Sequence, residues 1–475
     1  MNYYGQNNDT ICALSTANGM GAIAVIRISG PKAFSICSAI FSKNLEETTS
    51  HTALFGRIKS TAGTVIDEVL LTVLHEGKSF TGEATVEIAC HGSIYIQQQI
   101  LQLLIQNGCR MAEPGEFTMR AFLNGKMDLS QAEAVADLIS SQSQKAHEVA
   151  MNQMRGGFSS ELKELREKLI HFASLVELEL DFAEEDVEFA DRSELKILVA
   201  EVLNYIYRLL KSFELGNAIK NGVPVAIVGA PNTGKSTLLN QLVGENRAIV
   251  SNIAGTTRDV IEETLNIAGI LFRLIDTAGI REGLNESDSD RIEAIGIEKS
   301  HEKIAQAQLV LLMSDYSANG SASEGHNTMS TDETIRWSQE LQAEFPNKKF
   351  LVLANKLDIR SENSSIETNS DIEIQAISAK TGLGIEELKN WLVAQIQAGF
   401  DSSQETIVTN VRHVEALEKA AFSLNQAQTG LETNVTGDFV AMDIRQAMFH
   451  LGSITGDIST DDLLGNIFSK FCIGK

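Results

Sequence analysis

The chain has 475 residues and is 43% hydrophobic, which exceeds what one hydrophobic core accommodates, so we expect two to four domains. Its formal net charge of −24 at pH 7 excludes a protein that holds nucleic acid through a broad basic surface, so any RNA contact is expected to be local or delegated to a partner. No apolar run approaches the ~20 residues that cross a bilayer. The first basic residue is Arg27, so the N-terminal stretch resembles neither a signal peptide nor an arginine-rich transit peptide, and a cytoplasmic protein without a membrane segment is expected.

Residues 1–124 are expected to form a compact α+β domain. The stretches 21–28, 69–74 and 85–89 have the apolar, β-branched composition of strands, and 97–105 has helical apolar spacing. Asn107-Gly108 and Pro114-Gly115 are turn signals between these elements.

From about residue 125 the hydrophobic period becomes helical. Ser130 and Glu133 have the spacing of a capping box, which predicts the start of a first helix. Two more helices are expected over 162–176 and from about 192 to 215, and helical spacing returns after residue 401. We therefore expect one helical domain, built from 125–217 and 401–475, with another domain at 218–400 inserted into it. Insertion at an exposed loop is tolerated because the ends of the inserted domain lie close together.

The inserted domain opens with a P-loop pattern, G-x-x-x-x-G-K-S, at residues 229–236. An apolar strand precedes it and a helical pattern follows, which is the context this motif requires. Gly229 and Gly234 let the backbone fold around a phosphate, and the helix N-terminus directs N–H groups at the anion. Lys235 is expected to reach the β- and γ-phosphates, and the Ser236 hydroxyl to bind Mg²⁺. The alternative, a chance glycine-rich turn, does not explain the motifs that follow.

Three further motifs follow in the order found in guanine-nucleotide hydrolases: D-T-A-G at 276–279, N-K-L-D at 355–358 and S-A-K at 378–380. Asp276 is placed to hold the Mg²⁺ shell. The Asp358 carboxylate can accept from two donors of guanine that adenine lacks, so GTP rather than ATP is the predicted substrate. The predicted GTP-binding residues are Asn232, Thr233, Gly234, Lys235, Ser236, Thr237, Ser251, Asn252, Ile253, Ala254, Gly255, Thr256, Thr257, Asp276, Thr277, Ala278, Gly279, Asn355, Lys356, Asp358, Ser378, Ala379 and Lys380.

Two positions distinguish this pattern from a Ras-type switch. Ile280 stands where Ras-type enzymes carry the glutamine that orients the attacking water, so another group must do so. Asn232, inside the P-loop, could cage a monovalent cation together with carbonyls of the segment 251–259. The alternative is that Asn232 only stabilises the turn.

The five cysteines, Cys12, Cys37, Cys90, Cys109 and Cys472, are scattered and show no zinc-ligand spacing, which fits a reduced cytosol. Cys472 lies close to the chain end but not in a prenylation box. It is either an inert terminal thiol or a participant in catalysis.

Further motifs lie outside the nucleotide signatures: P-G-E-F-T at 114–118, R-A-F-L-N-G-K at 120–126, D-L-S-Q-A-E-A at 128–134, I-A-G-T-T-R-D at 253–259, D-L-L-G at 462–465 and F-C-I-G-K at 471–475. With them the chain resembles the bacterial tRNA-modification GTPases of the MnmE (TrmE) family over essentially its whole length. The resemblance implies a multidomain α/β fold, with an N-terminal α+β folate-binding-like domain, a discontinuous helical domain and an inserted Ras-like P-loop GTPase domain.

The resemblance also implies a function. Members act as homodimers with a flavoprotein partner of the MnmG (GidA) type, which carries the FAD, in a heterotetramer-like complex. They add a carboxymethylaminomethyl-type group to C5 of the wobble uridine, position 34, of certain tRNAs. The carbon comes from a 5-formyl- or methylene-tetrahydrofolate type donor that the N-terminal domain binds.

By motif position, the resemblance assigns roles to particular residues. Folate contacts fall to Arg27, Glu87, Lys126 and Lys475; potassium ligands to Asn232, Ser251, Ile253 and Thr256; magnesium hydroxyls to Ser236 and Thr257; and catalytic roles to Glu293, which would orient the water, and Cys472. Without the resemblance, Arg27 reads as an exposed charge at a strand end and Glu293 as a solvated glutamate on a helix surface. The segments 16–21 and 90–93 depart from the family pattern near the expected folate pocket.

Two other classes of function remain as alternatives. One is a regulatory switch of the ribosome-assembly type, in which the nucleotide gates binding and no covalent chemistry occurs. The other is a scaffold whose helical domain mainly dimerises. The folate-type residues and Cys472 discriminate, because neither alternative needs them.

Overall fold

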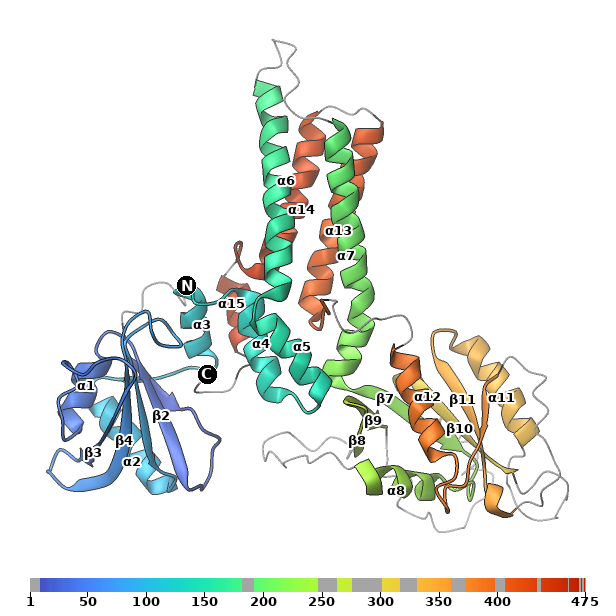
Figure 1. Ribbon diagram of the computed structural model, residues 1–475, viewed down its shortest axis with the longest axis horizontal. Coiled ribbons are helices and arrows are strands. Elements are labelled where there is room, and N and C mark those ends of the chain that lie inside the picture. Colours follow the sequence, from blue (N-terminus) through green and yellow to red (C-terminus); the bar gives the residue numbers. More distant parts are fainter. Residues whose placement is uncertain are drawn as a thin grey trace. The chain divides into compact units, whose positions relative to one another are not determined.

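The computed structural model describes residues 9–181, 192–246, 263–275, 301–316, 331–359, 372–397, 406–433, 437–459, 461–469, 471 and 474. The chain divides into two compact units, each described here by itself. Unit 1 comprises Met1–Ile139, Met151–Leu203 and Glu415–Lys475, and unit 2 comprises Ser140–Ala150 and Asn204–Val414. Unit 1 holds an α+β sheet domain and helices from both halves of the chain, and unit 2 holds an α/β domain (Figure 1), in line with the predicted fold class.

Unit 1 begins with a six-stranded sheet in the order β3-β4-β5-β2-β1-β6. All neighbours are antiparallel except β1 and β6, which are parallel. The strands are β1 (Ile11–Leu14), β2 (Ile23–Ser29), β3 (Thr52–Lys59), β4 (Val65–Leu74), β5 (Thr85–His91) and β6 (Arg110–Met111). Strands β2, β4 and β5 overlap the three predicted stretches, and β1, β3 and β6 were not predicted.

Helices cover one face of this sheet. The helices α1 (Ala33–Ile40) and α2 (Ile94–Gln106) share a core with alternate residues of β2, β4 and β5, including Ile26, Leu71 and Ile88. Along β5, Val86, Ile88 and Cys90 point into this core, so Glu87, Ala89 and His91 belong to the opposite face. That opposite face carries Arg27 and Glu87, two of the candidate folate residues.

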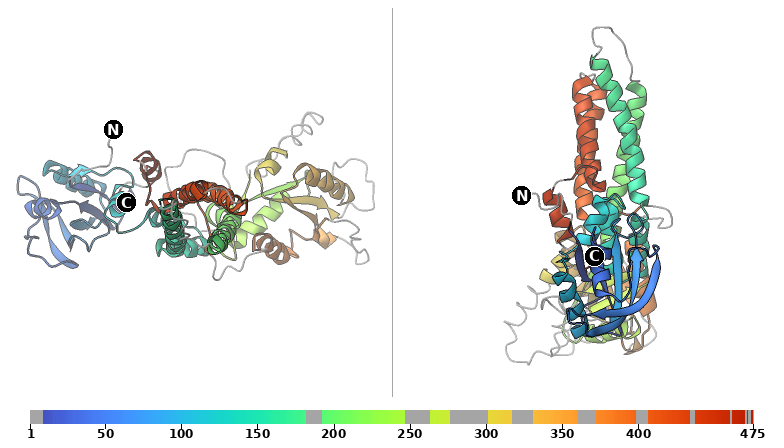
Figure 2. Two further views of the ribbon diagram at one scale, coloured as in Figure 1. Left: turned by 90° about the horizontal axis from the view of Figure 1, so that it is seen from above. Right: turned by 90° about the vertical axis from the view of Figure 1, so that its left-hand side faces the viewer.

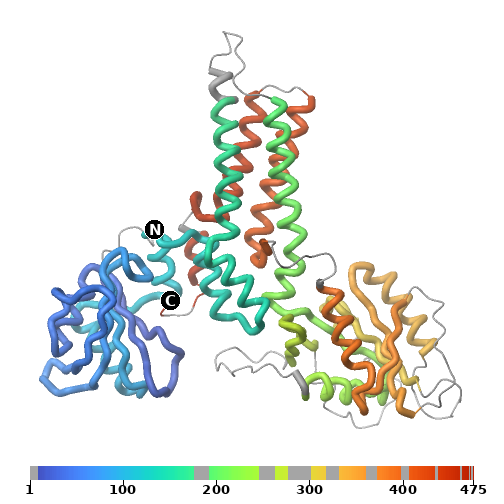
Figure 3. The backbone as a smooth tube through the Cα atoms, in the orientation of Figure 1, coloured from blue at the N-terminus to red at the C-terminus, as the bar shows by residue number. Residues whose placement is uncertain are grey.

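The end of the chain returns to this domain. Helix α15 (Asp461–Phe468) packs Leu464 and Phe468 into a cluster with α3 (Glu116–Leu123) and the start of α4 (Leu129–Ser140). Further along, the Ser15 hydroxyl donates to the Gly474 carbonyl at 3.2 Å. The red C-terminal segment accordingly lies beside the N-terminal domain in Figure 3.

The helical part of unit 1 contains long helices from both halves of the chain: α6 (Gly157–Asp181), the first part of α7 (Arg192–Asn221), most of α13 (Val411–Glu432) and α14 (Gly437–Thr455). They lie side by side in both views of Figure 2. Arg166 on α6 donates to Asp457 after α14 at 2.9 Å, which joins the two halves. Their buried residues include Leu169, Val199, Leu424 and Ile444.

The predicted capping box at Ser130 and Glu133 is wrong by two residues. Asp128 Oδ1 accepts from the Gln131 backbone N–H, and the Gln131 side chain accepts from the Asp128 backbone N–H, both at 2.9 Å. Asp128 is therefore the N-cap of α4, and the Ser130 hydroxyl donates to Asp128. Both residue pairs have the required spacing, and aspartate caps a helix as well as serine does.

Unit 2 is built around a second six-stranded sheet in the order β12-β11-β10-β7-β9-β8. Its pairs are parallel except β8 with β9. The strands are β7 (Val223–Gly229), β8 (Glu263–Ile267), β9 (Ile270–Leu274), β10 (Leu309–Asp315), β11 (Lys349–Asn355) and β12 (Ile374–Ala376). Every residue of β10 is buried, as expected for a strand covered on both faces.

Helices lie on both faces of this sheet. One face packs on α8 (Lys235–Asn246) and α12 (Ile385–Gln397), and the other packs on α11 (Thr331–Glu344). The first of these cores also takes in Ala146 and Val149 from α5 (Gln144–Met154). Helix α11 begins at Thr331, and Thr331 and Thr334 in its first turn are buried.

The last part of α7 is also part of unit 2. Leu215, Ala218 and Ile219 contribute to the core of its sheet, together with Ile407. The Val408 backbone N–H donates to the Ser212 hydroxyl at 3.0 Å. A Cβ on Gly216 would lie 2.0 Å from the Val408 carbonyl oxygen, so glycine is required for this close contact. Within the described residues of unit 2, the segment around Val408 therefore packs directly against α7.

Candidate functional site

The predicted P-loop joins β7 to α8 in the strand–turn–helix form that the sequence indicates. Asn232 has φ 64° and Gly234 φ 98°, both in the left-handed region. Thr233 is buried, and its hydroxyl donates to the Ala230 carbonyl at 2.8 Å. Within the described part of the chain, no backbone acceptor pairs with the N–H groups of Thr233 and Gly234. Such a loop can cradle an anion with its amide groups.

Two glycines of the loop have no room for a side chain. A Cβ on Gly229 would lie 2.4 Å from the Met313 carbonyl oxygen, and a Cβ on Gly234 would lie 2.2 Å from Asn355 Nδ2. Gly229 therefore lets β7 lie against β10, and Gly234 lets the loop lie against the N-K-L-D motif. The glycine spacing of the motif thus has a steric cause in this protein.

The Lys235 side chain folds over the loop. Its Nζ donates to the carbonyl oxygens of Gly229 and Ala230, each at 2.7 Å. Burial, followed by the nearby charge of Lys303, lowers the pKa of Lys235 to about 8. Its ammonium group is therefore poised to gain stabilisation from a bound phosphate.

We expect GDP binding to take up a proton near pH 8. The free protein has Lys235 about half deprotonated there, and phosphate charge favours the ammonium form, so binding raises the pKa of Lys235. Uptake of about half a proton is expected at pH 8 and none at pH 6, and affinity should fall as the pH rises above 8. Calorimetry in buffers of different ionisation enthalpy measures the uptake. Equal apparent enthalpies at pH 8 in all buffers would contradict this assignment.

Asn355 connects two of the predicted motifs to each other. At the end of β11 its Nδ2 donates to the Thr233 carbonyl of the P-loop at 2.7 Å. Its Oδ1 accepts from the backbone N–H of Ala379, in the S-A-K motif, at 2.9 Å. All three residues are buried. One amide side chain therefore fixes the spacing between the phosphate loop and the candidate base-binding loop.

The candidate base-binding residues lie beside this bridge. The Ser378 hydroxyl donates to Asp358 Oδ1 at 2.6 Å, and this hydrogen bond lowers the pKa of Asp358 from its ordinary value. The Asp358 carboxylate is exposed and ionised at neutral pH, so its second oxygen is available to a base. Lys380 follows at the tip of the same turn, which the bond from the Gly382 N–H to the Ser378 carbonyl closes.

Asp315 is a residue of this site that the sequence analysis missed. It ends β10 directly opposite Asn355, is 4% exposed, and forms an ion pair with Lys356 at 2.5 Å. Lys356 has φ 72°, so the backbone leaves the extended conformation of β11 at this residue, and the ion pair with Asp315 fixes its side chain. The available signal was that Asp315 is the only charged residue of a largely apolar strand, and it sits at the strand end.

Many predicted site residues lie outside the described residues, so their placement stays a prediction. These are Ser251, Asn252, Ile253, Ala254, Gly255, Thr256, Thr257, Asp276, Thr277, Ala278, Gly279, Glu293, Cys472 and Lys475. The residues that the structure does bring together are Asn232, Thr233, Gly234, Lys235, Ser236 and Thr237 with Asn355, Lys356, Asp358, Ser378, Ala379 and Lys380.

The candidate folate residues Arg27 and Glu87 are cross-strand partners on β2 and β5. Arg27 Nε donates to Glu87 Oε1 at 2.9 Å, and the guanidinium lies 5.4 and 5.6 Å from the ring centres of Phe80 and Phe117. Among the described residues, nothing else bonds to the pair, so two N–H₂ groups of Arg27 and one oxygen of Glu87 are available. The free Glu87 oxygen suits the amino edge of a ring such as a pterin.

Lys126 lies apart from that pair. Its Nζ donates to the Gly77 carbonyl at 2.9 Å, and its stem lies 3.2 Å from where a Cβ on Gly82 would be. In the same motif, the Asn124 side chain donates to the Thr81 carbonyl at 2.8 Å, and the Arg120 guanidinium donates to the Glu83 carboxylate at 3.1 Å. The motif at 120–126 therefore holds the loop 77–83, which carries Phe80 against Arg27.

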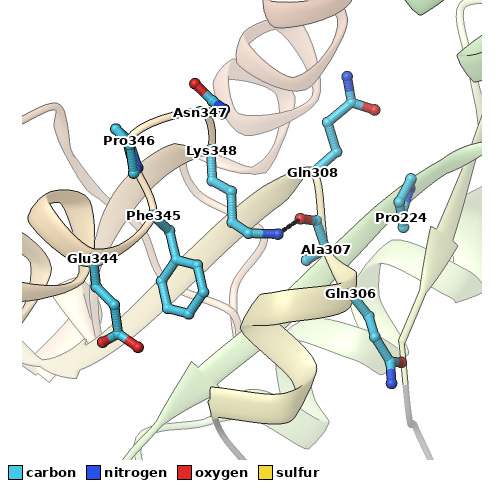
Figure 4. Close-up of a pocket in the computed structure, with 9 residues that line it drawn as sticks. All are labelled: Pro224, Gln306, Ala307, Gln308, Glu344, Phe345, Pro346, Asn347 and Lys348. Carbon is cyan, nitrogen blue, oxygen red and sulfur yellow. Dashed lines mark hydrogen bonds between the residues drawn. The ribbon is translucent and has the colours of Figure 1, made fainter.

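One cavity in unit 2 lies away from the nucleotide motifs. It has a volume of about 510 Å³ and is lined by Pro224, Gln306, Ala307, Gln308, Glu344, Phe345, Pro346, Asn347 and Lys348 (Figure 4). It lies where the parallel strands β7, β10 and β11 begin, whereas the P-loop lies where β7 ends. Lys348 points to the Ala307 carbonyl in Figure 4 and donates to it at 2.6 Å.

Among the described residues, no group of three or more His, Cys, Asp or Glu side chains could hold a metal ion. The ligands expected for Mg²⁺ and K⁺ here are instead hydroxyl, amide and phosphate oxygens. Across the same residues, no helix combines the length and apolar character of a bilayer span.

Comparison with known proteins matches nearly all of the chain. A family model described as "GTP-binding protein TrmE N-terminus" matches residues 10–126, and one described as "MnmE helical domain" matches residues 129–472. A Cytophaga hutchinsonii protein is 55% identical over 99% of this chain and 98% of its own length. Proteins of Flavobacterium johnsoniae and Parabacteroides distasonis are each 52% identical, over 99% and 98% of this chain and all of their own length.

All three relatives bear the name tRNA modification GTPase MnmE. Among solved structures, the G domain of the T. maritima FeoB iron transporter matches 36% of this chain and 96% of its own, at 26% identity. Its TM-score of 0.24 is too low to support a conclusion about the fold.

Proposed function

The chain belongs to the MnmE family, as the sequence motifs predicted, and we propose that it is a GTP hydrolase that acts in tRNA modification. One observation carries the nucleotide part of this proposal. Asn355 bonds at once to Thr233 in the P-loop and to Ala379 in the S-A-K motif, so the phosphate and base signatures form one site. Three separate sequence signatures would not meet in this way by chance.

The residues of this site divide the work of binding. The P-loop amides and Lys235 neutralise phosphate charge, and the Ser236 hydroxyl would be the Mg²⁺ ligand from this loop, with Thr257 as the second. Asp358 would accept from guanine, and the Ala379 N–H is already bound to Asn355, so the base oxygen would be met by another group of the S-A-K turn. Glu293 would orient the attacking water.

Asn232 fits a ligand of a monovalent cation. It is exposed, it stands at a left-handed position of the loop, and its side-chain amide has no partner among the described residues. K⁺ held there with Ser251, Ile253 and Thr256 would supply positive charge beside the phosphates, where an arginine acts in other GTPases.

We expect GTP turnover to fall by roughly 10²-fold when K⁺ is replaced by Na⁺, because a preorganised charge at the transition state has about that effect. Asn232→Ala should turn over GTP slowly and equally in both salts. Phosphate release under saturating GTP measures both rates. Asn240→Ala, an exposed amide on α8, is the control and should keep the K⁺ response. Equal wild-type rates in the two salts would return Asn232 to a turn-stabilising role.

For the modification step, we propose that the N-terminal domain binds a tetrahydrofolate one-carbon donor of the 5-formyl or methylene type. The available groups of Arg27 and Glu87, beside the rings of Phe80 and Phe117, support this. Lys475 would add a second cation. Lys126 supports the site through the loop 77–83, since its Nζ is bonded to Gly77. The bound donor would supply the carbon that is added to the wobble uridine.

The proposal includes partners. The protein would act as a homodimer with an FAD-carrying flavoprotein of the MnmG type on C5 of uridine 34 of certain tRNAs in the cytoplasm. The net charge of −24 repels RNA phosphates, which supports a complex in which the partner provides much of the RNA contact.

Nucleoside analysis of tRNA tests this function. A deletion strain should lack the modified wobble uridine, and the wild-type gene should restore it. Lys235→Ala should not restore it, because GTP binding is lost. Cys472→Ser should also fail to restore it while the purified variant still hydrolyses GTP. Unchanged nucleosides in the deletion strain would reject the modification function and favour the regulatory switch.

A further inference from the structure

An oriented histidine lies at the end of β5, on the same sheet face as Glu87. His91 Nδ1 bonds to Asp67 Oδ1 at 2.7 Å, and the His91 backbone N–H donates to Asp67 Oδ2 at 2.8 Å. Asp67 belongs to the neighbouring strand β4. A single carboxylate thus holds both the ring and the backbone of His91.

The two partners differ in their exposure to water. The Asp67 side chain is 7% exposed, whereas the His91 side chain is 69% exposed. Asp67 Oδ1 also accepts from the Glu68 N–H at 2.9 Å, so the carboxylate has three donors and little freedom to move. Because an ionised carboxylate only accepts, Nδ1 carries a proton and Nε2 faces solvent. This is the arrangement of a proton-transfer histidine with its orienting carboxylate.

The neighbouring thiol cannot take that role. Cys90 is 3% exposed, and its Sγ donates to the Ala24 carbonyl at 3.5 Å. Burial, followed by the charge of Asp67, raises the pKa of Cys90 to about 11. Cys90 therefore stays a neutral thiol at physiological pH. Of the two reactive side chains at 90 and 91, only the imidazole is available.

The position of His91 relates it to the candidate folate residues. Glu87, Ala89 and His91 alternate with buried residues along β5, so they share one face. Four residues of strand separate Glu87 from His91 by about 13 Å. A Cβ on Gly92 would lie 2.3 Å from the Gly21 carbonyl oxygen, so β2 and β5 stay closely packed up to His91. An extended ligand on Arg27 and Glu87 can reach it along the sheet.

We propose that His91, oriented by Asp67, is a proton-transfer residue that acts on an amine nitrogen of the reduced folate. This rests on the proposed folate site. In the step, the Nε2–H bond of the imidazolium breaks, an N–H bond forms on the amine nitrogen, and the positive charge moves with the proton. His91 is left neutral, with its remaining proton on Nδ1, which still donates to Asp67.

The first test uses binding and does not depend on turnover. In protein with ¹⁵N-labelled histidine, His91 should be the Nδ1–H tautomer, and its Nε2 resonance should shift when 5-formyltetrahydrofolate is added. Asp67→Asn should abolish the tautomer preference. An Nε2 resonance that does not respond to bound 5-formyltetrahydrofolate would overturn the proposal.

The second test uses the complete reaction with tRNA, flavoprotein partner and methylenetetrahydrofolate. His91→Ala should bind 5-formyltetrahydrofolate within about threefold of wild type, keep its GTP turnover and modify tRNA about 10²-fold more slowly. Added imidazole should restore much of that loss, which a purely structural role would not allow. His91→Gln is a second variant in case His91→Ala misfolds, because glutamine keeps a donor for Asp67. It should modify tRNA as slowly as His91→Ala.

His51→Asn is the control, because His51 is an exposed histidine of the same domain with φ 64°, which asparagine tolerates. It should modify tRNA at the wild-type rate. If both His91 variants bind folate and modify tRNA normally, or if imidazole restores nothing to His91→Ala, the proposal is wrong. If wild-type protein binds no 5-formyltetrahydrofolate, the folate part of the proposed function fails instead.

Discussion

Gly234→Ala is expected to lower the affinity for GDP and GTP by more than about 10²-fold. The new Cβ would lie 2.2 Å from Asn355 Nδ2, and φ 98° costs an alanine roughly 1–2 kcal/mol. To make room, Asn355 must leave Thr233 or Ala379. Each buried group left unpaired costs about 1–3 kcal/mol. Equilibrium binding of a fluorescent GDP analogue measures the loss.

Gly244→Ala is the matched control for this change. Gly244 lies in α8, nothing lies within 4 Å of its Cβ position, and its φ is that of an ordinary helix. Alanine there should raise the free energy of unfolding by about 0.5–1 kcal/mol and leave nucleotide affinity unchanged. Near-normal GDP binding by Gly234→Ala would contradict this prediction, because the P-loop and Asn355 could then move apart without loss of nucleotide affinity.

Asp358→Asn is expected to change the base preference of the nucleotide site from guanine to xanthine. In the proposed site the carboxylate would accept two hydrogen bonds from guanine, and the substituted amide would set a donor against a donor, so GTP affinity should fall by roughly 10²- to 10⁴-fold. The new amide can instead donate to the 2-oxo group of xanthine, so XTP should bind more tightly than GTP. The Ser378 hydroxyl can still donate to the side-chain oxygen of the substituted residue, which keeps the new amide in place.

Competition between GTP and XTP for the fluorescent analogue measures this exchange. Asp332→Asn is the control, because it makes the same chemical change at an exposed position in the first turn of α11. It should retain the wild-type preference for GTP. An Asp358→Asn variant that still prefers GTP would remove Asp358 from the base-binding site and place guanine recognition elsewhere.

The local parts of the nucleotide site could be predicted from the sequence because each is a short motif with its own backbone requirement. The left-handed φ of Gly234 and the strand–turn–helix around it follow from neighbouring residues. The bridge through Asn355 could not be predicted, since Thr233 and Ala379 come from segments far apart in the chain. The Asp315–Lys356 pair depends on the register of β10 with β11 in the same way.

The N-terminal domain shows the same limit. The strand pattern over 85–89 was predicted, but only the register of β2 with β5 pairs Arg27 with Glu87. Short elements such as β1, with four residues, give too little alternation to be recognised. The capping box was placed on the wrong pair, because two overlapping pairs satisfy the same spacing and only the backbone geometry distinguishes Asp128 from Ser130.

The contact of Val408 with α7 has a practical consequence for studying the GTPase in isolation. A fragment that starts at Gly222 and stops at Gln397 would discard Leu215, Ile219 and Ile407, and thereby open the hydrophobic interior of the nucleotide-binding module. A fragment from Asn204 to Val414 keeps Leu215, Ile219 and Ile407, and Val408 stays bonded to Ser212, although the partly buried Ala146 and Val149 of α5 are left out. We therefore expect the longer fragment to have the higher free energy of unfolding.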